Sequence, residues 1–179
     1  MSQLIERLAT RIALKIKEAS PEETASVELM KFALIGILHN AITIGTALAV
    51  GAILGRFGEV LLACAAFMLL RLFSGGFHFK SALSCFLFSA AIFVLIPLIP
   101  IGRDFPYLHL LTASSFMLCL FFAPANIKEH IRVPEKSFPL FKLISLALVT
   151  LSYFLSHPVV TLAFLAQSLT LLPLPRKRR

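Results

Sequence analysis

The sequence has too few polar residues to cover the surface of a soluble globular protein. Of its 179 residues, 58% are hydrophobic and only 15% are charged, whereas charged residues make up about 25% of a typical soluble domain. Several apolar runs are long enough to cross the hydrocarbon layer of a bilayer, which is about 30 Å thick. The composition therefore predicts an integral membrane protein, and we expect residues 1–179 to form a single membrane domain.

Cysteine pairs and metal-ligand clusters are absent as well. The three cysteines, Cys64, Cys85 and Cys119, form no CxxC motif, and the five histidines form no His-x3-His pattern. Neither a disulfide framework nor a thiolate or histidine metal site is indicated. We expect reduced thiols, no metal and no cofactor.

Hydrophobic segments dominate the rest of the chain. They predict an all-α polytopic protein with about six transmembrane helices in a bundle over residues 30–172, followed by a basic tail, residues 173–179. The second segment is short, so a re-entrant hairpin over residues 57–82 is an alternative. The predicted spans cover about residues 30–55, 57–73, 82–100, 105–123, 138–155 and 159–172.

The first nineteen residues are amphipathic. Arg7, Arg11 and Lys15 form a basic stripe beside the apolar residues Leu4, Leu8, Ile12 and Ile16. This pattern predicts a helix over residues 1–19 that lies on an anionic membrane surface, with packing against a partner as the alternative. The next helix is predicted to begin at Ser20, with Ser20 as its N-cap.

Basic residues are distributed unevenly over the predicted loops. With the N-terminus inside the cell, fifteen of the seventeen Lys and Arg residues face the cytoplasm, and only Arg56 and Arg103 lie outside. This asymmetry follows the positive-inside rule and places both termini and residues 71–85 on the cytoplasmic side. The net charge of +8 is thereby explained by topology, so nucleic-acid binding is not expected.

His78 and Cys85 bring a base and a thiol to this cytoplasmic boundary. A thiol attacks as its thiolate, which a nearby imidazole generates and stabilises. Seven residues of continuous helix would separate the two by about 10.5 Å, so the helix must be broken between them. The sequence Ser74-Gly75-Gly76 supplies a break before His78. Ser81 is then expected to be the N-cap of a helix with Cys85 in its opening turns, where the helix dipole favours a thiolate.

The non-catalytic alternative is that Cys85 is a small buried packing residue and His78 a solvated loop residue. No third catalytic residue can be chosen from the sequence. The candidates that remain open are Glu59, Ser84, Asn126, Glu129 and Glu135.

The ordered residues Arg71, Gly75, Gly76, His78 and Cys85, together with the stretch Ala123-Pro124-Ala125-Asn126, resemble the accessory gene regulator protein B (AgrB-like) family. These are membrane cysteine endopeptidases of bacteria that process quorum-sensing peptide precursors. The resemblance implies that Cys85 is the nucleophile and His78 the general base. It associates Arg71, Gly75 and Gly76 with loop shape and peptide docking, and we group Ser81 and Ser84 with these substrate-binding or loop-shaping residues.

The implied substrate is a short precursor peptide with an amphipathic N-terminal helix, a central Cys or Ser, and an acidic C-terminal tail. Removal of the tail and closure of a thiolactone or lactone ring is the implied reaction. The implied location is the bacterial cell membrane, with the active site at its cytoplasmic side.

Polar residues inside the first span support other interpretations. His39 and Asn40 would be unfavourable against lipid, so we expect them to form a structural hydrogen bond with another helix. Gly51-x3-Gly55 matches a small-residue dimer motif, which makes a homodimer a further expectation. A small transporter for a peptide or lipid is the main alternative function, with His39 and Asn40 along its path and the Gly-Gly hairpin as its gate. A catalytically silent membrane adaptor is the third.

Overall fold

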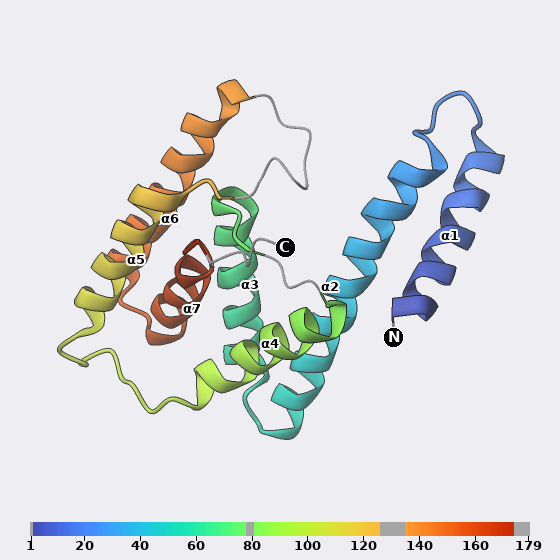
Figure 1. Cartoon of the computed structure of the whole chain (residues 1–179). Helices are drawn as coiled ribbons and strands as arrows, with labels where there is room; N and C mark the ends of the chain where they lie inside the picture. The colour runs from blue at the N-terminus through green and yellow to red at the C-terminus, as the bar shows by residue number, and fades with distance from the viewer. Residues whose placement is uncertain (1, 78–80, 126–134, 174–179) are drawn as a thin grey trace, which may run out of the picture.

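The computed structural model describes residues 2–77, 81–125 and 135–173. Within these ranges the regular structure is helical (Figure 1). The elements are α1 Ser2–Ala19, α2 Val27–Ile53, α3 Phe57–Ser74, α4 Ala82–Leu95, η1 Ile96–Leu98, α5 Leu108–Phe122, η3 Glu135–Ser137, α6 Phe138–Leu155 and α7 Pro158–Leu169.

The six predicted hydrophobic segments correspond to α2, α3, α4 with η1, α5, α6 and α7. By length and composition, α2, α3 and α6 are able to cross a membrane, whereas the other three are apolar but shorter. Six complete spans therefore remain a prediction. The alternative of a hairpin is less well supported, because α3 runs for 18 residues without a break.

The distribution of side chains is that of a protein in an apolar environment. Large apolar residues such as Phe121 and Phe154 are exposed on the outside of the helices, at 72% and 76%. Small polar residues are buried between the helices, among them Thr112, Ser115, Ser145, Ser152 and Ser168. Small and hydroxyl-bearing residues at helix contacts are typical of membrane proteins, where lipid is as apolar as the core.

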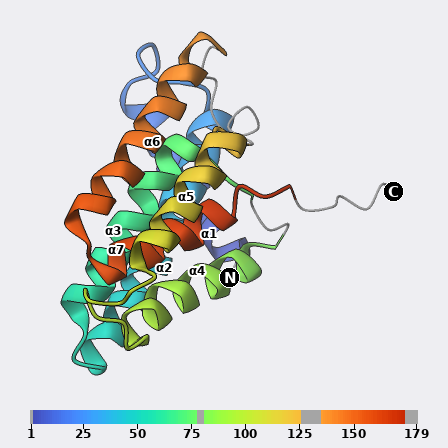
Figure 2. The ribbon, with the colours of Figure 1, turned by 90° about the vertical axis from the view of Figure 1, so that its left-hand side faces the viewer.

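Helix α3 occupies the centre of the bundle and packs against α7, α2 and α6 (Figures 1 and 2). Its buried face includes Val60, Phe67 and Leu70. The Phe67 ring meets that of Phe93 from α4 edge to face, with centroids 5.3 Å apart. A Cβ on Gly51 of α2 would lie 2.8 Å from the Val60 side chain.

Gly51 is therefore needed for contact between α2 and α3 of the same chain. Gly55 lies beyond the end of α2 with a φ of 68°. The two glycines do not form one exposed face of a helix, so the dimer motif predicted from their spacing is wrong. The expectation of a homodimer then depends on the family resemblance.

Helix α1 forms as predicted, but its contact with α2 uses a different face from the apolar stripe. The two helices lie antiparallel and side by side (Figure 1), and α1 buries Ile5, Ala9 and Ala13. Leu4 and Leu8 are exposed at 74% and 46%. The apolar stripe is thus left available for a membrane surface, and the interfacial position of α1 stays a prediction.

The prediction that the second helix begins at Ser20 is wrong. Residues 21–24 form a turn, and α2 begins at Val27. Ser26 is the N-cap, because its extended backbone lets its hydroxyl accept a hydrogen bond from the Leu29 amide. The Lys17 ammonium donates to the Pro21 carbonyl, which fixes the intervening turn against the end of α1.

Candidate functional site

The segment after α3 leaves helical geometry at two glycines, as the sequence predicts. Gly75 and Gly76 have φ values of 70° and 138°, which residues with a Cβ rarely adopt. A Cβ on Gly76 would also collide with the hydroxyl of Thr170. Close packing and backbone angle therefore both require glycine at position 76.

This segment, which we call the glycine loop (residues 74–77), is held by the ends of two other helices. The Gly76 amide donates to the Ala125 carbonyl at 3.0 Å, and the Ala125 amide donates to the Ser74 carbonyl at 2.9 Å. The Phe77 amide donates to the Thr170 carbonyl at 2.9 Å. The C-terminal ends of α3, α5 and α7 thus meet at one end of the bundle.

Gln167 of α7 is the buried partner of the glycine loop. Its amide nitrogen donates to the Gly75 carbonyl at 2.6 Å and to the Ser74 hydroxyl at 3.1 Å. Its oxygen accepts from Arg71 at 3.2 Å. The other terminal nitrogen of Arg71 donates to the Phe77 carbonyl at 2.9 Å.

Gln167 was not among the site residues predicted from the sequence. The signal was present, because an amide within an apolar helix is unfavourable unless it is hydrogen-bonded. The hydrogen bonds place Arg71 and the glycine loop in one polar cluster.

Cys85 is the fourth residue of α4 and so lies in its opening turn, as predicted. Ser81 occupies the N-cap position, but its side chain makes no capping hydrogen bond; its carbonyl accepts from the Cys85 amide at 3.1 Å. Ser81 and Ser84 are both exposed. Their predicted part in binding or loop shape remains a prediction.

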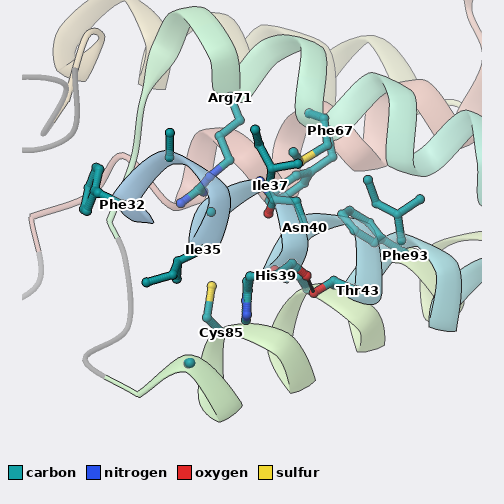
Figure 3. A pocket seen from close by; sticks show the side chains of 16 residues that line it. Phe32, Ile35, Ile37, His39, Asn40, Thr43, Phe67, Arg71, Cys85 and Phe93 are labelled. Atoms are coloured by element: carbon teal, nitrogen blue, oxygen red, sulfur yellow. Dashed lines mark hydrogen bonds between the residues drawn. The ribbon is translucent and has the colours of Figure 1, made fainter. Parts of the chain in front are cut away.

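A cavity of about 760 Å³ lies between α2, α3 and α4, and Cys85 is part of its wall (Figure 3). Most of the wall is apolar and includes Phe32, Phe67 and Phe93. Arg71 of α3 lines the same cavity as Cys85 (Figure 3).

His39 and Asn40 also line this cavity, reaching it from α2 (Figure 3). Within the described part of the chain, neither side chain makes a hydrogen bond. The predicted structural hydrogen bond to another helix is therefore wrong. The structure instead brings both side chains to the same space as Cys85, which the sequence alone did not indicate.

Several predicted residues lie outside the described ranges. His78 is one of them, and Asn126 and Glu129 are others. The side chain of Glu135 is likewise not described. Their roles remain predictions from the sequence.

The position and contacts of Glu59 decide whether it can be a third catalytic residue. It pairs with Arg56 at 3.2 Å in the first turn of α3. Twelve residues of helix, about 18 Å, separate it from Arg71. Glu59 is therefore not the third member of a site at Cys85.

The other two cysteines are packing residues, as expected. Cys64 and Cys119 are buried at 3% and 0% exposure, and the Cys119 sulfur lies 3.4 Å from the Ser168 hydroxyl. Among the residues that the structure describes, no three His, Cys, Asp or Glu side chains form a group able to hold a metal ion.

Comparison with known proteins identifies the family of this chain. A family model described as Accessory gene regulator B matches residues 5–172. The chain belongs to the accessory gene regulator B family. This finding confirms the resemblance drawn from Arg71, the two glycines, His78 and Cys85.

Individual relatives agree with the family assignment. An AgrB-like protein of Halalkalibacterium halodurans is 31% identical over 68% of this chain, which spans 61% of that relative's length. Accessory gene regulator protein B of Staphylococcus aureus is 31% identical over 77% of this chain and 78% of its own. The corresponding protein of Staphylococcus intermedius is 28% identical over 96% of this chain and 95% of its own. No solved structure matches significantly.

Proposed function

We propose that this accessory gene regulator B protein is a membrane cysteine endopeptidase that cleaves a short signalling-peptide precursor and promotes its cyclisation. The observation that carries the proposal is the position of Cys85 in the wall of a largely apolar cavity, together with Arg71. A partly exposed thiol in such a cavity can receive a peptide. A buried packing cysteine, such as Cys64, has no such access.

The chemistry begins with attack of the Cys85 sulfur on a peptide carbonyl. The C–N bond of the amide breaks, a thioester forms, and the thiol proton is transferred to the leaving amine of the tail. A Cys or Ser side chain of the peptide then attacks the thioester. The ring closes as a thiolactone or lactone, and the Cys85 thiol is regenerated.

Arg71, His78 and the glycine loop support this reaction in different ways. The Arg71 guanidinium lines the same cavity as Cys85, where a cation stabilises the negative charge that develops during the attack. His78 follows the glycine loop by one residue and acts as general base, then as general acid; this role rests on the sequence motif. Hydrogen bonds from Gln167, Thr170 and Ala125 hold the glycine loop, which directly precedes His78 in the chain.

The apolar wall of the cavity favours ring closure over hydrolysis. A thioester exchanges with a peptide thiol at nearly balanced free energy, whereas water would destroy it irreversibly. Exclusion of water from the acyl-enzyme is therefore a requirement of the proposed reaction. We place this site on the cytoplasmic side, where the precursor is made.

The test replaces each cysteine in turn while a precursor with an acidic tail is co-expressed. Cys85→Ala and His78→Ala should abolish tail removal, and both proteins should still reach the membrane. Cys64→Ala and Cys119→Ala are the matched controls and should retain cleavage, because both thiols are buried away from the cavity. Cleavage by Cys85→Ala would remove the proposed nucleophile.

A second measurement separates cyclisation from simple hydrolysis. With the ring-forming Cys of the peptide changed to Ala, the acyl-enzyme should accumulate on Cys85 and be released by hydroxylamine. Mass spectrometry should show one equivalent of released tail for each adduct. Tail release that turns over freely, with no adduct and no ring from either peptide, would contradict the cyclising mechanism.

Transport of a peptide or lipid is the second candidate, and the position of His39 and Asn40 in the cavity is the observation that favours it. A transporter would not need the thiol of Cys85. Movement of intact precursor across proteoliposomes that contain Cys85→Ala protein would favour transport over cleavage.

A further inference from the structure

His39 and Asn40 are the thirteenth and fourteenth of the 27 residues of α2, in the middle of the longest candidate span. We call these two side chains the α2 polar strip. They face the cavity that holds Cys85 and make no hydrogen bond within the described residues. Polar groups at this depth are unfavourable unless a partner is supplied.

Other polar side chains of α2 find partners within the helix itself. The Thr43 hydroxyl donates to the His39 carbonyl, and the Thr46 hydroxyl donates to the Ile42 carbonyl, each at 2.8 Å. The His39 imidazole and the Asn40 carboxamide form such bonds to their own helix less readily than a threonine hydroxyl does. Each of the two groups can both donate and accept hydrogen bonds. The α2 polar strip thus presents unused donors and acceptors to the cavity.

An extended peptide in the cavity would have backbone groups that require hydrogen-bond partners. Its backbone N–H and C=O groups lose water where the wall is formed by Phe32, Phe67 and Phe93, and each group then requires a partner. Arg71 already donates to Gln167 and Phe77.

We propose that the α2 polar strip is a subsite that hydrogen-bonds the backbone of an extended peptide whose apolar side chains fill the rest of the cavity. This inference rests on the proposed function for the nature of the ligand. A lipid acyl chain would leave the strip without partners, because it has no hydrogen-bonding groups.

The experiment measures protection of Cys85 from a thiol reagent by defined peptides. The protein, in lipid nanodiscs, carries Cys64→Ala and Cys119→Ala so that Cys85 is its single thiol. The probes are acetyl-Phe-Ile-Leu-amide and the same peptide with N-methylated backbone amides, and the reagent is monobromobimane. The unmodified peptide should slow alkylation at concentrations about tenfold lower than the methylated one, since backbone hydrogen bonds are lost in the latter.

Leucine substitutions assign this difference to the α2 polar strip. In His39→Leu/Asn40→Leu protein the two peptides should protect equally, and leucine keeps α2 favourable in the membrane. Thr46→Leu is the matched control: it removes a polar group from the same helix outside the cavity wall and should preserve the tenfold difference.

Three results would overturn the inference. One is equal protection by both peptides in the protein with its natural strip, and another is a difference that survives in the double-leucine protein. The third is slower alkylation of His39→Leu protein without any peptide, which would assign His39 to activation of the thiol. Alkylation reports binding without cleavage, so a protein that protects as expected but never cuts a precursor would refute the proposed function alone.

Discussion

At the scale of single residues, the buried amide of Gln167 connects the parts of the site that the sequence showed separately. It bonds to Arg71, to Ser74 and to the Gly75 carbonyl, and it is fully buried. Arg71 is thereby held near Cys85 by a residue 96 positions away in the chain. Gln167 therefore holds Arg71 and the glycine loop in place without lining the cavity itself.

Replacement of Gln167 by Leu should therefore affect both stability and the reactivity of Cys85. The change removes the amide that donates to the Gly75 carbonyl and the oxygen that accepts from Arg71, which should lower the free energy of unfolding by about 1–3 kcal/mol. Thermal unfolding can be followed by dye labelling of Cys64 and Cys119 as they become exposed. Alkylation of Cys85 below the unfolding temperature should also slow, because Arg71 is no longer fixed near the thiol.

The control is Ser114→Ala, which removes a half-buried hydroxyl whose hydrogen bond goes to the Leu110 carbonyl within α5. It should change neither measurement. If Gln167→Leu lowered stability but left the alkylation rate of Cys85 unchanged, Gln167 would have a structural role alone.

At the scale of elements, the glycine loop joins the end of α3 to the ends of α5 and α7. The sequence predicts the break itself, since adjacent glycines permit backbone angles that other residues resist. It does not predict the contacts that hold the loop, which come from Ala125 and Thr170. The family-like stretch that begins at Ala123 thus contributes to the site through its backbone.

Gly76→Ala should disrupt this element, while Gly58→Ala should not. At position 76 the new Cβ would have an unfavourable φ and would collide with Thr170, so we expect a loss of about 1–3 kcal/mol in stability. Gly58 is helical with no atom within 4 Å of a built Cβ, and alanine there should be neutral or stabilising. Dye-based thermal unfolding of both variants checks the contrast, and equal melting temperatures would contradict the structure of the loop.

At the scale of the whole molecule, the bundle brings the chain segments before residues 78, 126 and 174 to one end. The hydrogen bonds from the glycine loop to Ala125 and Thr170 require this arrangement. The distribution of basic residues groups the same three segments on the cytoplasmic side. The agreement supports the predicted alternation of the helices, whereas the side of the membrane is still inferred from charge.

Single cysteines on opposite ends test this orientation. In a protein whose native cysteines are replaced by Ala, Lys136→Cys should be shielded from an impermeant thiol reagent in intact cells, and Asp104→Cys should react. Both positions are exposed in the structure, so a difference reports the side of the membrane and not burial. Labelling after permeabilisation should make the two sites equal, and the reverse pattern in intact cells would overturn the charge argument.

The sequence by itself determined the helical segments, the break at Gly75 and Gly76, and the place of Cys85 in an opening helical turn. These features depend on hydrophobic length and on local backbone preferences, which neighbouring residues set. Local capping was less certain, as Ser26 in place of Ser20 shows.

Only the tertiary structure decided which segments are neighbours. It brought His39 and Cys85 to one cavity, Gln167 to Arg71, and the Ile5 face of α1 to α2. The length of an apolar run indicates that a helix is embedded in the membrane, but it does not indicate which helix it packs against. The partner is chosen by close packing and by pairing of buried polar groups between residues far apart in the chain.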